Sequence, residues 1–282
     1  MIETNPLEFS FEKIVREALY EDLGHQGDIT SNSVIEKDLE NSFVLKSRAD
    51  GVISGIQVAE LSFKILDSSL SFKKNLNDGS NVKKGDIIAT IKGSASSILS
   101  AERTALNFLS HLSGIASATN EMVELISETN TKIVSTRKTT PNLRVLEKFA
   151  VKNGGGINHR FGLYDGILIK DNHLALSKSI SNSISKAKEK CGHMVNIEVE
   201  VDNLEQYKEA LETETDAILL DNFEIDDLIE AVNLNKKNIV LEASGKITKG
   251  NILEVAKTGV NLISSGWITH SSPSLDIGLD FS

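Results

Sequence analysis

The chain has 282 residues, 40% of them apolar and 25% charged, and a formal net charge of −10. This is the composition of a globular protein with one large domain or two unequal ones. An acidic chain lacks the basic surface that general nucleic-acid binding requires, and no apolar run approaches the roughly 20 residues of a membrane-spanning helix. The single cysteine, Cys191, excludes an intramolecular disulfide and a cysteine metal cluster. Since the first residues also lack the pattern of a secretion signal, we expect a cytoplasmic protein with no nucleic-acid or membrane partner.

The first third of the chain mixes helical and strand patterns. Apolar residues at helical spacing predict a helix over 9–23, and a glycine-rich turn follows it. Three strand-like runs come next, at 43–46, 52–54 and 87–91. This mixture indicates an α/β domain that differs in character from the rest of the chain.

A second helix, predicted over 97–112, has one face of small polar residues around a single arginine. That face carries Arg103, Asn107, Ser110 and Gly114. It indicates contact with a ligand or a partner subunit, whereas the alternative is an ordinary surface arginine beside Glu102. The spacing alone does not decide between the two.

After residue 130 the pattern becomes regular, because short β-branched runs alternate with helical segments. The strands are predicted at 133–134, 167–169, 197–199, 217–220, 239–241 and 262–263. The helices between them include 143–152, 203–211, 225–233 and 251–257. Such alternation predicts a parallel sheet of βαβ units, and six units favour a (β/α) barrel over an open sheet. No G-x-G-x-x-G follows the first strand, which argues against an open dinucleotide-binding sheet.

Residues 137–173 form the most basic stretch, with seven Lys or Arg residues against three acids and the run Gly154-Gly155-Gly156. Cations beside flexible backbone indicate a site for a small, multiply anionic ligand. The alternative is a solvated basic face. The cations lie at the ends of apolar runs, which favours the ligand site.

Polar residues follow each of the six predicted strands, and in a barrel these positions share the C-terminal rim, where active sites lie. Arginines suit carboxylate ligands, and the late Ser-Gly pairs suit a phosphate. The middle carboxylates, Glu200 and Asp221, could hold Mg²⁺ or accept hydrogen bonds from sugar hydroxyls. In chain order the groups are Thr136-Arg137-Lys138, Lys170-Asp171-Asn172-His173, Glu198-Val199-Glu200, Asp221-Asn222, Glu242-Ala243-Ser244-Gly245 and Ser264-Ser265-Gly266. Six in succession predict one shared active site.

A set of short motifs runs nearly from end to end of the chain. The motifs are Glu21-Asp22, Gly27-Asp28-Ile29-Thr30, Glu102-Arg103-Thr104-Ala105-Leu106-Asn107, Ser113-Gly114-Ile115-Ala116, Thr136-Arg137-Lys138-Thr139, Gly154-Gly155-Gly156, Asn158-His159-Arg160, Leu168-Ile169-Lys170-Asp171-Asn172-His173, Glu198-Val199-Glu200-Val201, Leu220-Asp221-Asn222-Phe223, Glu242-Ala243-Ser244-Gly245 and Thr269-His270-Ser271. Together they resemble the quinolinate phosphoribosyltransferase family, also called carboxylating nicotinate-nucleotide pyrophosphorylase.

The resemblance implies a reaction and an architecture. Quinolinate would condense with phosphoribosyl pyrophosphate in the presence of Mg²⁺, releasing pyrophosphate and CO₂ and giving nicotinate mononucleotide, a precursor of NAD. The implied fold is an α/β barrel of seven strands instead of eight, with an N-terminal α/β sandwich. We expect the sandwich to comprise 1–112 with 272–282, and the barrel 113–271. The implied active unit is a homodimer in which one sandwich covers the partner's barrel, and a hexamer of such dimers is a further option.

The resemblance also implies residue roles. Arg103 would reach quinolinate from the neighbouring subunit. Lys138, Lys170, Glu200 and Asp221 would be catalytic, with the last two holding Mg²⁺ and contacting ribose. The basic pocket would comprise Thr136, Arg137, Lys138, His159, Arg160 and Lys170. The phosphate loops would comprise Ser244, Gly245, Lys246, Ser265 and Gly266, with Trp267 and His270 beside them.

Two positions depart from the family pattern, since Lys246 stands where glycine or asparagine is frequent and Asn142 stands where glycine is common. Lys246 would alter the phosphate loop or add a cation to it.

We expect His159 and His173 to position groups and not to transfer protons. One rival is a paralogue associated with molybdenum transport, which would lack part of the dicarboxylate pocket. Another is a non-enzymatic barrel that binds a phosphorylated ligand. Such a binder has less need of a metal, so the presence of both Glu200 and Asp221 argues against it.

Overall fold

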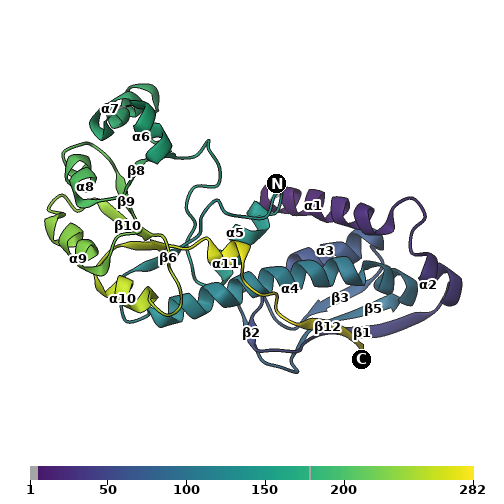
Figure 1. Ribbon diagram of the computed structural model, residues 1–282. Helices are drawn as coiled ribbons and strands as arrows, with labels where there is room; N and C mark the ends of the chain where they lie inside the picture. The colour runs from purple at the N-terminus through teal and green to yellow at the C-terminus, as the bar shows by residue number, and fades with distance from the viewer. Residues whose placement is uncertain (1–5, 178) are drawn as a thin grey trace. The chain divides into compact units, whose positions relative to one another are not determined.

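The computed structural model describes residues 6–177 and 179–282, and the chain divides into two compact units (Figure 1). The first unit comprises residues 1–120, 139–155 and 268–282, and the second comprises 121–138 and 156–267. Helices α4 (Ala95–Leu125) and α11 (Trp267–His270) run across the boundaries between these segments. Among the described helices, none has the length and apolar character needed to cross a membrane.

The first unit is built on an antiparallel sheet in the order β12-β1-β5-β3. The strands are β1 (Glu40–Ser47), β3 (Ser71–Lys74), β5 (Ile87–Ser94) and β12 (Ile277–Phe281), and β2 (Gly51–Val52) pairs separately with β4 (Asn81–Val82). The last strand of the chain lies beside β1, with Phe43 opposite Phe281. Backbone hydrogen bonds therefore join the C-terminal segment to the N-terminal sheet.

Helices α3 (Ile56–Leu66) and α4 bury the apolar residues of this sheet. The unit also contains α1 (Pro6–Leu23), α2 (Ile29–Val34) and α5 (Arg144–Asn153), and α1 packs on both α3 and α5. Apolar side chains of β1, β5, α3 and α4 form one buried cluster, which includes Leu45, Ile91, Phe63 and Leu109. The predicted helices and strands are present, although α4 continues to Leu125, beyond the predicted end at 112. Helices α2 and α3 and strands β3, β4 and β12 were not predicted.

The second unit contains a six-stranded parallel sheet in the order β6-β11-β10-β9-β8-β7. The strands are β6 (Lys132–Val134), β7 (Ile167–Ile169), β8 (Ile197–Val201), β9 (Ala217–Asp221), β10 (Val240–Ser244) and β11 (Leu262–Ser264). A single parallel bridge joins Val134 to Ile157 and occupies a seventh position, beside β6. From β7 to β11 the strands follow one another in space as in the chain, and β6 then pairs with β11. This confirms the prediction of an incomplete (β/α) barrel.

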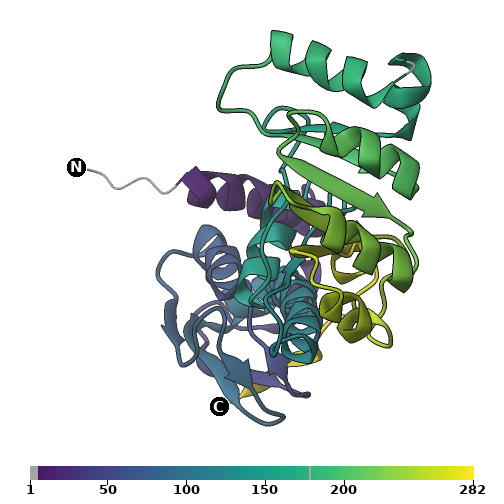
Figure 2. The same ribbon diagram turned by 90° about the vertical axis from the view of Figure 1, so that its left-hand side faces the viewer.

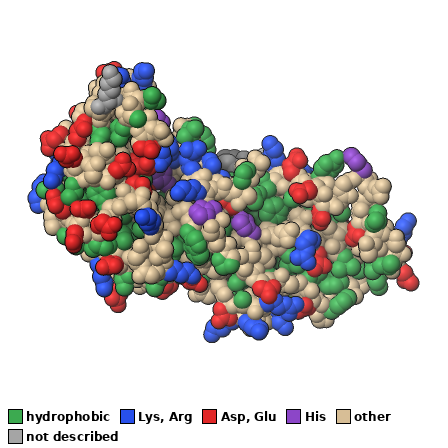
Figure 3. Space-filling view, in the orientation of Figure 1, with side chains coloured by type: hydrophobic (Ala, Val, Ile, Leu, Met, Phe, Trp, Pro, Cys, Tyr) green, Lys and Arg blue, Asp and Glu red, His purple; other side chains and the backbone are tan. Residues whose placement is uncertain are grey.

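Helices between the strands surround the sheet (Figure 1, Figure 2). They are α6 (Asp171–Ser177), α7 (Ile180–Lys190), α8 (Leu204–Leu211), α9 (Ile225–Leu234) and α10 (Ile252–Lys257). Successive helices from α7 to α10 pack on one another, as expected for the outer layer of a barrel. Acidic side chains gather on α8 and α9, where Glu205, Asp226 and Glu230 are exposed (Figure 3). Much of the negative charge of this unit is therefore on its outer surface, away from the strand ends.

Candidate active site

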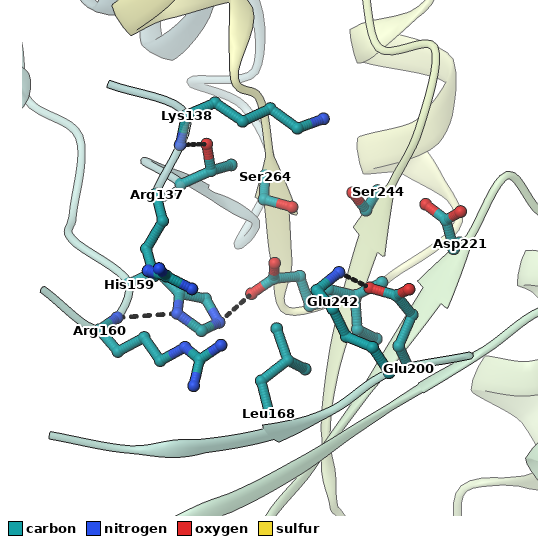
Figure 4. Close-up of a pocket in the computed structure, with 13 residues that line it drawn as sticks. Arg137, Lys138, His159, Arg160, Leu168, Glu200, Asp221, Glu242, Ser244 and Ser264 are labelled. Carbon is teal, nitrogen blue, oxygen red and sulfur yellow. Dashed lines mark hydrogen bonds and ion pairs between the residues drawn. The ribbon is translucent and has the colours of Figure 1, made fainter. Parts of the chain in front are cut away.

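A pocket of about 410 Å³ lies in the second unit, where the carboxyl ends of its parallel strands meet (Figure 4). Parallel strands place the residues that follow them at one edge of the sheet, so side chains distant in sequence converge there. Nine predicted site residues line this pocket: Thr136, Arg137, Lys138, His159, Arg160, Lys170, Glu200, Asp221 and Ser244.

Four further residues line the pocket: Leu168, Leu219, Glu242 and Ser264. Glu242 and Ser264 belong to the predicted strand-end groups but had no individual role, whereas Leu168 and Leu219 were not predicted as site residues. Leu168, Leu219 and Glu242 lie two positions before a predicted residue that also lines the pocket, namely Lys170, Asp221 and Ser244 respectively. In a strand, side chains at i and i+2 point to the same face. This alternation was present in the sequence and could have identified them.

The other predicted residues do not line this pocket. Gly245 and Ser265 directly follow lining residues, and Lys246, Gly266 and Trp267 come just after them in the chain. Arg103 and His270 belong to the first unit. There, Arg103 lines a separate cavity of about 440 Å³ with Asn107, Ser110 and the segment 274–277. The polar face of α4 thus meets the C-terminal segment of its own chain, a neighbour that the spacing had not indicated.

The basic stretch 137–173 does not form one cluster. Arg144, Lys148 and Lys152 lie on α5, in the first unit, and Lys148 is fully buried there. Gly154 packs against α4, since a Cβ at this position would lie 2.3 Å from the carbonyl oxygen of Ala116. Gly154 therefore serves helix packing. Among the described residues that line the pocket, four of the seven cations are present.

Two guanidinium groups, those of Arg137 and Arg160, lie on the same side of the pocket (Figure 4). Nη1 of Arg160 donates a hydrogen bond to the carbonyl oxygen of Gly166 at 2.9 Å, which fixes the side chain. Burial lowers the pKa of Arg160, repulsion by Arg137 lowers it further, and Glu198 and Asp165 act in the opposite direction. The fold thus holds two like charges near each other, an arrangement that an anionic ligand would stabilise.

His159 has both ring nitrogens in hydrogen bonds within the protein. The backbone N–H of Arg160 donates to Nδ1 at 2.7 Å, so Nδ1 carries no proton. The proton is therefore on Nε2, which faces Oε2 of Glu198 at 2.6 Å. A neutral ring in this tautomer supports the backbone at Arg160 and has no nitrogen left for proton transfer. His173 is similarly engaged, because its Nδ1 accepts the backbone N–H of Lys170 at 2.9 Å.

Glu242 is a buried carboxyl group at the floor of the pocket, and its side chain is only 2% exposed. Burial raises its pKa to about 7, and the neighbouring Glu198 contributes to this rise. The positive charge of Lys170 and a hydrogen bond with Ser264 favour the charged form but are weaker effects. Near neutral pH this group therefore exists partly as the protonated acid, which limits the negative charge at the pocket floor.

Glu200 and Asp221 are the two acids on the opposite side of the pocket from the arginines (Figure 4). Glu200 forms an ion pair with Lys170. Oδ2 of Asp221 accepts a hydrogen bond from Nδ2 of Asn222 at 2.7 Å. Two carboxylates that face a cavity are a donor set that Mg²⁺ accepts, because this ion binds one or two carboxylates together with ligand phosphates.

A second group of possible metal ligands lies deeper in the unit. One atom each of His159, Glu198 and Glu242 lie within 4.8 Å of one another. His159 and Glu198 share a hydrogen bond, and Glu242 has a raised pKa that favours its protonated form. These two facts explain why the three side chains lie close together without a metal ion. The Glu200–Asp221 pair is therefore the better match for Mg²⁺.

The fold and the pocket together define an α/β-barrel protein with a site for anionic ligands at its C-terminal rim. Residues 28–113 match the N-terminal domain of quinolinate phosphoribosyl transferase, and residues 115–280 match its C-terminal domain. The chain belongs to the quinolinate phosphoribosyl transferase family.

Relatives match over almost the whole chain. The chain is 45% identical to the probable nicotinate-nucleotide pyrophosphorylase (carboxylating) of Bacillus subtilis (strain 168), over 95% of this chain and 92% of that protein. It is 37% identical to quinolinate phosphoribosyltransferase (decarboxylating) 1b of Nicotiana tabacum, over 96% of this chain and 82% of that protein. The structure of the nicotinate-nucleotide pyrophosphorylase from Francisella tularensis has a TM-score of 0.94 and 37% identity, covering 100% of this chain and 99% of that one.

Proposed function

We propose that the protein transfers the phosphoribosyl group of phosphoribosyl pyrophosphate to quinolinate with loss of CO₂, giving nicotinate mononucleotide and pyrophosphate. Family membership over nearly the full length supports this activity. One structural observation carries it, namely that Arg137 and Arg160 share a side of the pocket although they repel each other. Paired guanidinium groups suit a ligand with two carboxylates, and quinolinate is a dianion.

The cations of the pocket offset the electrostatic repulsion between the two substrates. Both substrates are anionic, and two like unit charges 4 Å apart repel by roughly 4 kcal/mol at an effective dielectric constant near 20. Among the described residues that line the pocket, four are cations and three are acids, and one acid, Glu242, is partly protonated near neutral pH. The balance is positive, so the pocket reduces the repulsion that the two anions would otherwise meet there.

The opposite side of the pocket suits the phosphoribosyl group. Asp221 would accept hydrogen bonds from ribose hydroxyls, and Ser244 would donate to the 5′-phosphate. Gly245 has φ of +87°, a conformation that glycine adopts readily and that exposes backbone N–H groups to a phosphate. Ser265, Gly266, Trp267 and His270 are proposed to complete this subsite, and Lys246 would add a cation to it.

Mg²⁺ is the cofactor that this chemistry implies, and Glu200 and Asp221 are the residues proposed to hold it. The ion would neutralise charge on the departing pyrophosphate. Lys170 forms an ion pair with Glu200, so the same carboxylate links the metal to the cation side of the pocket. Lys138 and Lys170 are proposed to contact substrate directly.

The reaction then needs positioning and charge stabilisation, with no protein nucleophile. The ring nitrogen of quinolinate attacks the anomeric carbon as the bond to pyrophosphate breaks. The carboxylates of Glu200 and Asp221 favour the positive charge that develops on the sugar. Once the nitrogen is quaternary, the ring accepts the electron pair left by the departing CO₂, and a proton replaces the carboxylate. His159 contributes by holding Arg160 in place.

The active assembly is proposed to be a homodimer in the cytoplasm. In it, Arg103 of one subunit would reach the quinolinate bound to the other. Such dimers could also assemble into hexamers. Arg103 is exposed at the cavity that it lines with Asn107 and Ser110, which supports its availability to a partner subunit. Arg103→Ala should raise the KM for quinolinate and leave the KM for phosphoribosyl pyrophosphate nearly unchanged.

One assay separates this function from its rivals. The protein is incubated with quinolinate, phosphoribosyl pyrophosphate and Mg²⁺, and CO₂ release is measured together with nicotinate mononucleotide. The molybdenum-associated paralogue and the non-enzymatic binder both predict no CO₂. Replacing quinolinate by nicotinate tests whether the second carboxylate is required, and strong turnover of nicotinate would contradict the role of the paired arginines.

A further inference from the structure

The turn after β9 contains one residue that contacts three parts of the proposed site. Asn222 directly follows Asp221 and has φ of +55°, in the left-handed region that asparagine tolerates better than most residues. Its Nδ2 donates to Oδ2 of Asp221 at 2.7 Å. Because a carboxylate oxygen only accepts, the NH₂ end of the amide faces Asp221 and Oδ1 points elsewhere.

Asn222 also joins the end of β9 to the end of β10. Its backbone N–H donates to the carbonyl oxygen of Ser244 at 3.0 Å, just beyond the last register pair, Asp221 with Ser244. The residue that holds the Asp221 carboxylate is thus itself tied to the neighbouring strand. If the Asp221 carboxylate rotated, it would lose its hydrogen bond with the Asn222 amide. The amide could not easily follow, because the Asn222 backbone is bonded to β10.

The side chain of Asn222 lies against the backbone of Gly245. A Cβ added at Gly245 would be 2.2 Å from Oδ1 of Asn222, closer than any real contact allows. The φ of +87° at Gly245 disfavours a side chain for a second, independent reason. The amide therefore fills the space between the Asp221 carboxylate and the backbone after Ser244.

We propose that Asn222 is a positioning residue that orients the Asp221 carboxylate and aligns it with the Ser244–Gly245 backbone for phosphoribosyl pyrophosphate and Mg²⁺. The inference rests on the proposed function and adds to it a residue that contacts no substrate. The arginines that would bind quinolinate are on the other side of the pocket (Figure 4). Loss of the amide should therefore affect one substrate and spare the other.

Asn222→Gly tests this, because glycine keeps the positive φ and removes only the amide. We expect the KM for phosphoribosyl pyrophosphate and the Mg²⁺ concentration for half-maximal rate to rise about five- to tenfold, the size of one hydrogen bond. The KM for quinolinate should stay within about twofold of wild type. Calorimetric titration with phosphoribosyl pyrophosphate in Mg²⁺ buffer without quinolinate, where no turnover occurs, should show binding weakened by a similar factor.

Asn238→Gly is the matched control. Asn238 is exposed, has the same φ of +55°, and precedes β10 at the end of the strand opposite to the pocket. It reports what a glycine in this backbone conformation does to folding alone. Both variants should lower the thermal unfolding temperature by similar small amounts, and only Asn222→Gly should change the binding of phosphoribosyl pyrophosphate.

An unchanged KM and affinity for phosphoribosyl pyrophosphate in Asn222→Gly would overturn the inference. Equal rises in the KM of both substrates would also overturn it, because they indicate general damage to the fold. Absence of turnover by the wild-type protein would instead overturn the proposed function. In that case calorimetry on the two variants still measures whether Asn222 supports phosphoribosyl pyrophosphate binding.

Discussion

The two sides of the pocket are built in different ways. Glu200, Asp221 and Ser244 lie within regular strands, so the parallel register of β8, β9 and β10 fixes where each side chain emerges. Arg137 and Arg160 come instead from segments outside the regular strands, after β6 and after the single bridge at Ile157.

The cation side depends on particular side-chain contacts because it lacks a continuous backbone ladder. Arg160 is held by the carbonyl oxygen of Gly166, and its backbone N–H is held by His159, which Glu198 supports in turn. The comparison teaches that backbone register sets where the acidic side chains emerge, whereas the position of the arginines depends on individual side-chain contacts.

The largest expected effect is the loss of the pocket cation that pairs with Glu200. Lys170→Ala removes a positive charge from the pocket and leaves Glu200 without its ion-pair partner. One hydrogen bond to a charged ligand contributes about 1.5–3 kcal/mol, so kcat/KM should fall roughly 10- to 150-fold. Steady-state kinetics with both substrates measure this fall.

Lys208→Ala is the control for Lys170→Ala. Lys208 forms an ion pair with Glu230 on the outer helices at 3.1 Å, and its side chain is 55% exposed against 45% for Lys170. An exposed pair of this kind contributes little, so this variant should retain wild-type kinetics. Near-normal turnover by Lys170→Ala would contradict the role proposed for Lys170.

Glu242→Gln tests whether the carboxyl group at the floor of the pocket is protonated in the folded protein near neutral pH. The pKa of Glu242 is raised from 4.5 to about 7, so the folded state binds this proton more tightly than the unfolded state does. Wild-type stability should therefore decline as pH rises from about 4.5 to about 7, because the folded protein must then carry a buried negative charge. The glutamine amide stays neutral and avoids this loss.

We expect Glu242→Gln to be more stable than wild type at pH 8, by up to about 3 kcal/mol, and to differ little near pH 5. Its KM for quinolinate should also rise less between pH 6 and pH 8. Urea unfolding at the two pH values and kinetics across the range measure both effects. A stability difference that is the same at pH 5 and pH 8 would show that the carboxyl group does not titrate as described.

The smallest expected effect comes from Lys246, next to the proposed phosphate loop on the acidic side. Its φ of +39° is unfavourable for a residue with a side chain. Lys246→Gly should therefore relieve strain and stabilise the fold by up to about 1 kcal/mol, offset in part by the greater entropy of glycine in the unfolded chain. Thermal unfolding measures the gain.

The same variant separates two roles of Lys246. If the side chain adds a cation to the phosphate loop, the KM for phosphoribosyl pyrophosphate rises a few-fold while stability improves. If the KM is unchanged, Lys246 is tolerated in this turn without contributing to binding. Asn142→Gly is the control, because Asn142 also has a positive φ, of 65°, and lies in the first unit.

Much of the barrel and its rim could be predicted from the chain alone. Alternating β-branched and helical runs predicted the order of strands and helices, and parallel strands place the residues that follow them at one edge. Nine predicted site residues therefore line one pocket. The i, i+2 alternation that also identifies Glu242 and Leu219 was equally available in the sequence.

Other features required the folded chain, because they depend on contacts between residues distant in sequence. The basic stretch looked like one cluster, yet Arg144 and Lys148 lie on a helix of the first unit. Nor does spacing reveal that the face with Arg103 meets the C-terminal segment, that His159 is locked in one tautomer, or that Asn222 fills the space above Gly245. The sequence by itself determined which residues end each strand, since periodicity is local. Only the tertiary structure decided which charges share a pocket, because burial and distance arise when strands and loops pack together.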